Sequence, residues 1–242
     1  MLIDQSAYNN RWRQVSPAAK AVFCLCGISA AFLAGQPGMS GTVAFVIALI
    51  TIIGAGIPVS RYLRAIAPAL LFLGLSTLTL LVSFDSTGIT FTGAGRDQTA
   101  QLCGRAAASV TALLFVALTT PMTEILALLR KLKLPDLLLD MAVIGYRMLF
   151  VFSDAVQQIR TAQSARLGYA NYRHSLRALG QLVAAVTLQV WQRAAALDLA
   201  ASARCNDGSL RFLTPVYGHA RRDLAVSLCA GAGLIMIALL PV

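Results

Sequence analysis

Hydrophobic residues run without a charged side chain through four long stretches of the chain, at 21–60, 65–84, 106–123 and 224–242. A membrane-spanning helix needs roughly 20 mostly apolar residues, so the first stretch is long enough for two spans, separated at Gln36-Pro37-Gly38. The pattern therefore predicts five membrane-spanning helices. They are expected at about 20–35, 39–58, 65–83, 104–121 and 223–241.

The hydrophobic pattern becomes amphipathic in the second half of the chain. Residues 122–134 alternate leucines with basic side chains, which predicts a helix lying flat in the membrane interface. Pro135 suits the start of a long helix that runs to Arg166, and a second amphipathic helix is expected from 176 to 204. The predicted fold is an all-α membrane protein with about five transmembrane helices plus long amphipathic cytoplasmic helices. The expected domains are 1–120 with four spans, 121–222 with the cytoplasmic and interfacial helices, and 223–242 as the last span.

Composition supports a membrane protein. Hydrophobic residues make up 57% of the chain, charged residues 12%, and the mean hydropathy is +0.71. Soluble domains carry about 25% charged residues.

The distribution of Lys and Arg predicts the orientation, because basic residues of short loops stay on the cytoplasmic side. Of the 20 basic residues, 18 fall in the N-terminal segment, in the loop with Arg61 and Arg64, or in 121–222. The N-terminus is therefore expected in the cytoplasm and the C-terminus outside. Nucleic-acid binding is not expected, because these charges flank the spans and are not interleaved with stacking aromatics.

Three charged residues of the first long cytoplasmic helix recur at intervals of seven: Asp140, Arg147 and Asp154. This spacing places them on one helix face. They are interpreted as an interhelical charge seam. Such a seam can be a fixed structural feature, or it can rearrange during a transport cycle, and the sequence leaves both readings open.

Both long amphipathic helices end in a similar sequence that carries an arginine. The first ends at Ala165-Arg166-Leu167 and the second at Ala203-Arg204-Cys205, and Gly168 and Gly208 are expected to terminate them. Ordinary capping of a helix end would explain one such arginine. Two of them are separated by on the order of 40 Å if the second helix is straight, which suits one arginine tip for each subunit of a dimeric partner. Arginine carries a permanent charge that pairs bidentately with carboxylates.

The chain resembles the transmembrane component of energy-coupling factor (ECF) transporters, in particular the CbiQ branch of cobalt importers. The resemblance covers most of the chain and includes its opening, with Ser16-Pro17-Ala18-Ala19-Lys20, and the mid-chain pairs Leu134-Pro135 and Tyr146-Arg147. Ala165-Arg166 and Ala203-Arg204 match the two Ala-Arg-Gly coupling motifs of the family. Leu167 and Cys205 stand where that family usually has glycine.

The resemblance implies a non-enzymatic coupling subunit in the bacterial cytoplasmic membrane. Two ATPase subunits would bind ATP and magnesium, and their closure would move the two arginine-tipped helices. A separate membrane subunit, expected to bind a metal ion, would then release its cargo inside the cell. The resemblance assigns ATPase docking to Ala165, Arg166, Leu167, Ala203, Arg204 and Cys205, and no cofactor to this chain.

The inventory of motifs agrees with a non-catalytic subunit. The sequence has no phosphate-binding loop of the G-x-x-x-x-G-K-[ST] type, and its two histidines, His174 and His219, have no ligand cluster at metal-binding spacing. A membrane enzyme would need ionisable residues at membrane depth. A stand-alone secondary transporter or channel is the main alternative, which midplane charges or broken helices would favour. The substrate-binding subunit of the same transporter class is disfavoured by the two arginine ends.

Two matters stay open in the sequence. Cobalt is the favoured cargo, nickel is the next candidate, and a vitamin remains an alternative because another subunit selects the substrate. The outer segment 84–101 is compatible with a short extended hairpin or with a plain loop.

Overall fold

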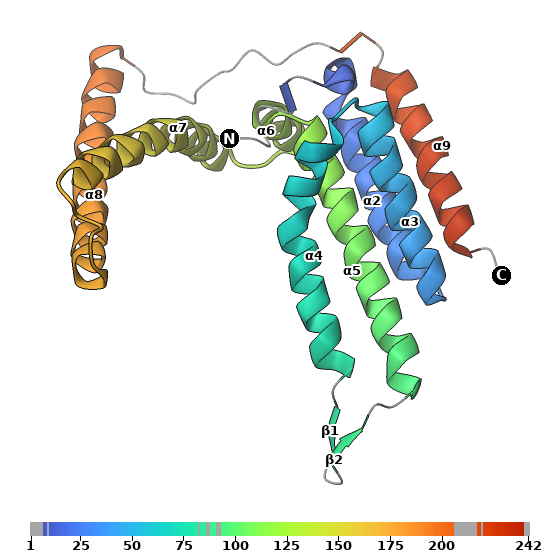
Figure 1. Ribbon diagram of the computed structural model, residues 1–242. Coiled ribbons are helices and arrows are strands. Elements are labelled where there is room, and N and C mark those ends of the chain that lie inside the picture. The colour runs from blue at the N-terminus through green and yellow to red at the C-terminus, as the bar shows by residue number, and fades with distance from the viewer. Residues whose placement is uncertain are drawn as a thin grey trace. The chain divides into compact units, whose positions relative to one another are not determined.

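The computed structural model describes residues 7–8, 10–81, 83–85, 88–90, 93–205, 217–218 and 220–239 (Figure 1). The chain forms two compact units, which we describe separately. Unit 1 comprises 1–128 and 214–242, and unit 2 comprises 129–213.

Unit 1 is a helical bundle that begins with a short 3-10 helix, Arg11–Gln14. Ser16 caps the next helix by accepting a hydrogen bond from the backbone N–H of Ala19 at 3.3 Å, and Pro17 suits the first helical position because it needs no N–H partner there. The helices of the bundle are α2 (Pro17–Leu33), α3 (Pro37–Leu49) with a π-helical continuation at Ile50–Gly54, α4 (Val59–Leu81), α5 (Gly93–Thr119), the beginning of α6 (Met122–Lys131) and α9 (Ala220–Leu239).

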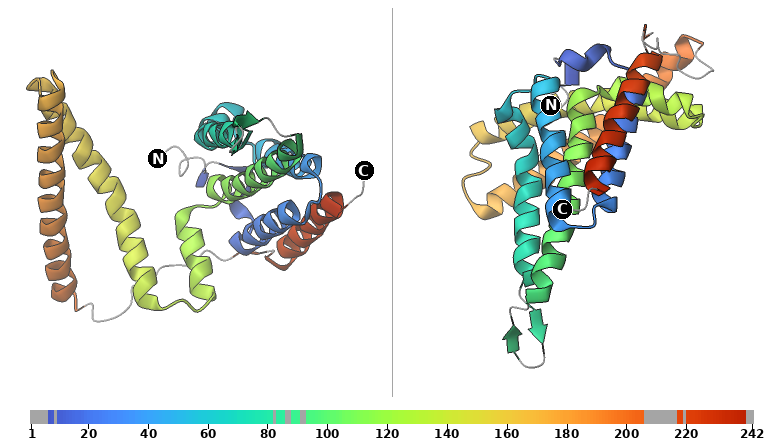
Figure 2. Two further views of the ribbon diagram at one scale, coloured as in Figure 1. Left: turned by 90° about the horizontal axis from the view of Figure 1, so that it is seen from below. Right: turned by 90° about the vertical axis from the view of Figure 1, so that its right-hand side faces the viewer.

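The helix α5 is the centre of the bundle. It packs against α2, α3 and α4, and α9 packs against α2 on the far side (Figure 2). Small residues make these approaches close: Ala30, Ala31, Ala108 and Ala112 are fully or almost fully buried. Small side chains at helix interfaces are typical of membrane bundles, where tight packing rather than water drives association.

The π-helical segment brings α3 against the N-terminal 3-10 helix. A Cβ on Gly54 would lie 2.6 Å from the Trp12 ring, so only glycine leaves room for the indole at this position. The backbone N–H of Arg11 also donates to the carbonyl of Ala55 at 3.2 Å. The 3-10 helix is therefore held against the π-helical end of α3.

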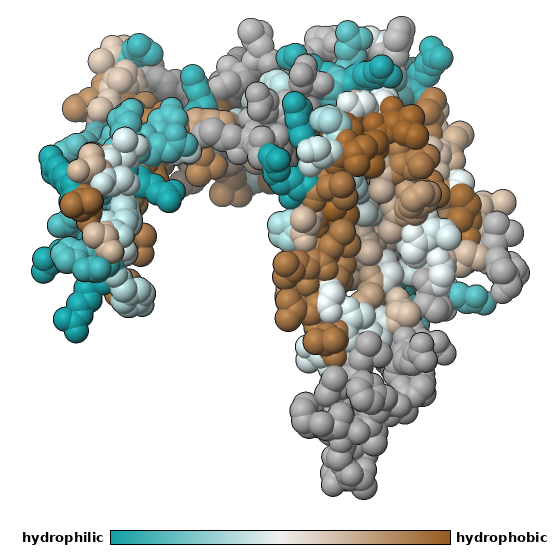
Figure 3. All heavy atoms as spheres, in the orientation of Figure 1, coloured by the Kyte–Doolittle hydropathy of each residue, from teal (hydrophilic) through white to brown (hydrophobic). Residues whose placement is uncertain are grey.

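A helix of the structure occupies each of the five predicted spans. Three helical segments are long and apolar enough to cross a membrane by length and composition: Val59–Thr79, Thr99–Thr119 and Ala220–Leu239. Pro17–Leu33 and Gly38–Gly54 are apolar but shorter. Exposed leucines and Phe72 give α4 a continuous hydrophobic side (Figure 3), as expected for a helix in contact with lipid.

The helix of the fourth span begins earlier than the expected start of that span near 104. The helix α5 begins at Gly93, and its window that is long and apolar enough to cross a membrane is Thr99–Thr119. The outer segment is a hairpin, in which β1 (Ser83–Asp85) pairs antiparallel with β2 (Gly88–Thr90). Apart from this hairpin, the regular elements of the described residues are helical, which confirms the predicted all-α membrane fold.

The longer α5 includes one charge, Arg105, within its apolar window. Its guanidinium donates to the carbonyl of Ala34 at 3.3 Å, and the Gln101 amide donates to the carbonyl of Gly35 at 3.0 Å. These carbonyls follow the last turn of α2, where the helix offers no internal donor. Arg105 therefore has a structural function in closing the end of α2.

Unit 2 contains two long helices, α7 (Asp136–Ala165) and α8 (Tyr172–Ala203), which pack against each other near the turn that joins them. The second helix was expected from 176, but α8 already begins at Tyr172. Most large apolar side chains of this unit are exposed, including Leu137, Leu149 and Trp191.

Candidate functional site: two arginine-tipped helix ends

The helix α7 ends at Arg166 in a Schellman motif. The N–H of Leu167 donates to the carbonyl of Ser164 at 3.1 Å, and the N–H of Gly168 donates to the carbonyl of Gln163 at 2.8 Å. This pair of bonds satisfies two carbonyls that a helix end otherwise leaves open. We call Ala165, Arg166 and Leu167 the Arg166 tip.

The helix α8 ends with nearly the same backbone geometry. Arg204 has φ −99° and ψ 11°, against φ −96° and ψ 17° for Arg166. The N–H of Cys205 donates to the carbonyl of Ser202 at 3.0 Å, which repeats the bond between Leu167 and Ser164. We call Ala203, Arg204 and Cys205 the Arg204 tip.

The residue after each arginine adopts the left-handed conformation, with φ 57° at Leu167 and φ 50° at Cys205. A residue with a Cβ is disfavoured there by about 1–2 kcal/mol, and glycine is not. Glycine would avoid this cost at both positions. Both helix ends nevertheless adopt this conformation with Leu167 and Cys205.

Gln163 fixes the Arg166 tip to the beginning of α8. Its amide nitrogen donates to the carbonyl of the buried Ala178 at 2.9 Å, and its amide oxygen accepts from the Tyr169 hydroxyl at 2.7 Å. Gly168 is also constrained, because an added Cβ would lie 2.9 Å from the Gln163 carbonyl oxygen. Gly168 follows the left-handed Leu167 at the end of α7, whereas Gly208 lies outside the described residues.

All six residues of the two tips are exposed, and Leu167 is 75% exposed. Within the described part of the chain, no ion pair involves Arg166 or Arg204. Each tip therefore offers a permanent cation beside a small alanine. This arrangement can bind a carboxylate on a partner surface.

Of the three residues of the predicted charge seam, Asp140, Arg147 and Asp154, the first is in an ion pair and the other two are exposed. Asp140 forms an ion pair with Arg130 of α6, at 3.7 Å, and Arg130 also contacts Asp136 at 3.6 Å. Arg147 and Asp154 are exposed, and no ion pair among the described residues joins the three. Residues seven positions apart lie about 10.5 Å apart along a helix, which is too far for a direct ion pair between their backbone positions. Charged groups from another element would be needed to connect Asp140, Arg147 and Asp154.

The structure also shows a buried polar cluster in unit 1 that the sequence did not predict. Lys20 is 2% exposed and donates from Nζ to the carbonyl of Thr119 at 2.9 Å. The Asn10 amide donates to the same carbonyl at 3.0 Å. Asp223 accepts the N–H of Ser16 at 3.2 Å. Together these contacts connect the starts of α2 and α9 with the end of α5.

Glu124, on the first turn of α6, is buried beside this cluster. Burial, together with the Glu124 carboxylate, raises the pKa of Tyr217 well above its usual value, so that the Tyr217 hydroxyl stays protonated. The residues next to Lys20 in the sequence give no sign of its acceptor at Thr119, which lies 99 positions later.

The described residues hold no group of three or more His, Cys, Asp or Glu side chains that could bind a metal ion. His174 is exposed at the start of α8, and His219 lies outside the described residues.

Comparison with known proteins identifies the family of this chain. The family model described as CbiQ, cobalt transport protein, matches residues 9–214. A cobalt transport protein CbiQ of Rhodobacter capsulatus is 34% identical over 215 residues, which cover 88% of this chain and 87% of that protein. An uncharacterized protein of Methanocaldococcus jannaschii is 27% identical over 226 residues, covering 89% of this chain and 84% of that protein.

A third relative, a putative fused cobalt transport protein CbiMQ of Methanocorpusculum labreanum, is 27% identical over 221 residues, covering 86% of this chain but 37% of that longer protein. The family model covers well over half of the chain, and its match includes both arginine tips. The chain belongs to the CbiQ family of cobalt transport proteins, membrane components of cobalt transport.

Proposed function

We propose that this chain is the coupling subunit of an ATP-driven importer of the ECF type, with cobalt as the favoured cargo. In this proposal two ATPase subunits on the cytoplasmic side bind ATP and magnesium. Each ATPase subunit accepts one tip, and closure of the ATPase pair moves α7 and α8. The N-terminus lies in the cytoplasm and the C-terminus outside the bacterial inner membrane.

The observation that carries the proposal is the matched geometry of the two tips. Both helices end with the same backbone conformation at an exposed arginine that follows a small alanine. A single cap of this kind is ordinary, but two that repeat the dihedral angles within about 6° suit two equivalent sites on a dimer. Docking of each arginine against a carboxylate would resist separation when the partner moves.

A second polypeptide that holds the substrate completes the proposed importer. The name of the Methanocorpusculum labreanum relative describes a fusion of which the CbiQ-like region is one part. Such a fusion supports a close association between this chain and a second membrane subunit that selects the metal ion.

The experiment that tests the proposal is co-purification of a tagged chain with co-expressed candidate ATPases, together with uptake of radioactive cobalt. Arg166→Ala, Arg204→Ala and the double variant are compared with the wild type. The matched controls are Arg160→Ala and Arg193→Ala, which remove exposed arginines from the same two helices. Each tip variant should reduce ATPase retention about tenfold or more, because loss of one member of a close charge pair costs several kcal/mol.

Both controls should retain the ATPase and support uptake. Equal retention by the double variant and the wild type would reduce the arginines to ordinary helix caps and would refute the coupling function of the tips.

A further inference from the structure

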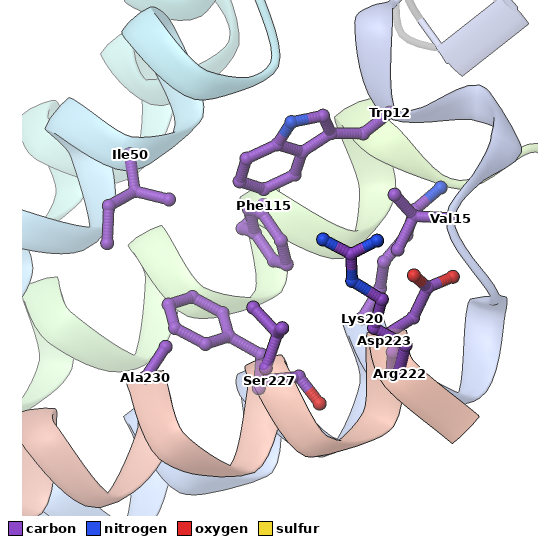
Figure 4. Close-up of a pocket in the computed structure, with 12 residues that line it drawn as sticks. Trp12, Val15, Lys20, Ile50, Phe115, Arg222, Asp223, Ser227 and Ala230 are labelled. Carbon is purple, nitrogen blue, oxygen red and sulfur yellow. The ribbon is translucent and has the colours of Figure 1, made fainter. Parts of the chain in front are cut away.

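Unit 1 contains a pocket of about 290 Å³ between the N-terminal 3-10 helix, α2, α5 and α9 (Figure 4). Its walls are mainly apolar and include Phe23, Phe115 and Val226. All residues that line it belong to unit 1. The ATPase contacts proposed above involve the two arginine tips and not this pocket, and the cargo is proposed to bind to another subunit.

The pocket is polar at one end and apolar at the other. Lys20, Arg222 and Asp223 line it at the first turns of α2 and α9. Farther along the same helices, Phe23 and Ala230 provide its hydrocarbon walls. Polarity therefore falls from the helix ends towards the middle of the bundle, in the same sense as it falls from the surface of a bilayer to its interior.

The charges at the polar end are not equivalent. Lys20 already donates to the carbonyl of Thr119, and Asp223 already accepts the N–H of Ser16. Arg222 extends its guanidinium group from α9 into the pocket (Figure 4), and it forms no ion pair with any residue that the structure describes. The carboxylates of Glu124 and Asp223 both act on Lys20. Arg222 is therefore the cation of this end that an added anionic group would balance.

We propose that this pocket binds an anionic phospholipid, with the phosphate at Arg222 and one acyl chain against Phe23, Phe115 and Ala230. An apolar cavity favours hydrocarbon over water, because water finds too few hydrogen-bond partners there. The phosphate oxygens match the planar donors of a guanidinium group. A lipid at this place would connect the starts of α2 and α9 with α5.

Native mass spectrometry of the purified full-length chain in detergent tests the proposal. The probes are dioleoyl phosphatidylglycerol, dioleoyl phosphatidylcholine and free glycerol phosphate, and the readout is the fraction of protein that retains one bound molecule. Phosphatidylglycerol should be retained over phosphatidylcholine, and glycerol phosphate without acyl chains should not be retained. Arg222→Gln should lower the retention of phosphatidylglycerol about tenfold, since it removes a charge-assisted contact.

Two further variants separate the head-group contact from the acyl-chain contact. Arg222→Lys keeps the charge and should keep most of the preference for phosphatidylglycerol. Ala230→Phe fills the apolar part and should lower the retention of both lipids. The matched controls are Arg221→Gln and Ala225→Phe, on the same helix but outside the pocket lining, and both should behave as wild type.

Equal retention by Arg222→Gln and Arg221→Gln would overturn the proposal, as would equal retention of the two lipids by the wild type. Binding that occurs only after deletion of residues 1–6 would also overturn it, because the start of the chain itself would then be the occupant. Circular dichroism of each variant confirms that a loss of lipid is not a loss of fold.

Discussion

The carbonyl oxygen of Gln163 accepts the main-chain N–H of Gly168 at 2.8 Å, and it lies 2.9 Å from the place where a Cβ on residue 168 would stand. One backbone atom thus both holds the end of α7 and excludes a side chain from the following turn. The same glutamine binds Ala178 of α8 through its amide group. The position of the Arg166 tip therefore depends on a few atoms of Gln163 and Gly168.

Gly168→Ala should destabilise the protein by about 1–3 kcal/mol, the usual cost of forcing an extra group into a closely packed place. The matched control is Gly180→Ala, inside α8, where nothing lies within 4 Å of an added Cβ. That control should stabilise the helix by about 0.5–1 kcal/mol, since alanine is the better helix former. Thermal unfolding followed by circular dichroism in detergent measures both. A shift of the same sign in the two variants would contradict the steric argument.

Leu167→Gly and Cys205→Gly should each stabilise their helix end by about 0.5–1 kcal/mol, because glycine relieves the left-handed strain but adds flexibility to the unfolded chain. Ala196→Gly, at an exposed interior position of α8, should instead destabilise by about 1 kcal/mol. The comparison of melting temperatures decides between strain and general helix propensity. Unchanged or lowered stability in both tip variants would show that the left-handed residues carry no strain.

Gln163→Leu should loosen the pairing of α7 with α8, because it removes one bond to Ala178 and one to Tyr169. Loss of two such bonds corresponds to about 1–3 kcal/mol. The readout is limited proteolysis of the turn that joins the two helices, with Gln158→Leu, an exposed position on α7, as the control. Cleavage at the same rate in both variants would argue against a fixing function for Gln163.

Lys20→Met should destabilise unit 1 by about 1.5–3 kcal/mol, because it removes a buried cation that donates to the Thr119 carbonyl. Lys131→Met, at an exposed position, should change stability by less than about 0.5 kcal/mol. Chemical denaturation in detergent distinguishes the two. A loss that is equal in both variants would place the effect in overall charge and not in the buried contact.

The sequence predicted the helices well where apolar runs are long, because the need for roughly 20 apolar residues leaves few alternatives. It placed the start of the fourth span near 104, whereas α5 begins at Gly93 and its apolar window begins at Thr99. Local composition does not fix such a boundary, because a helix can continue beyond its apolar residues.

The two arginine ends were visible in the sequence as a near repeat, but their geometry was not. A glycine often marks a left-handed residue at a helix end, but these positions hold Leu167 and Cys205. Their left-handed conformation is seen only in the dihedral angles of the structure. The cluster around Lys20 was unpredictable for another reason. The acceptor of Lys20 is the backbone carbonyl of Thr119. Every residue has such a carbonyl, so the type of residue at 119 gives no hint of the contact.

The π-helical segment at Ile50–Gly54 sets the rotational phase of the residues that follow it. A π turn encloses one more residue than an α turn, and each residue of a helix rotates the chain by about 100°. A chain with one residue fewer in this segment would close as a regular α-helix and carry Gly54 away from the Trp12 indole. Another residue would then lie against the Trp12 ring, and its side chain would clash with the indole. The 3-10 helix would no longer pack against the end of α3. Chain length at this point thus matters as much as the identity of the residues.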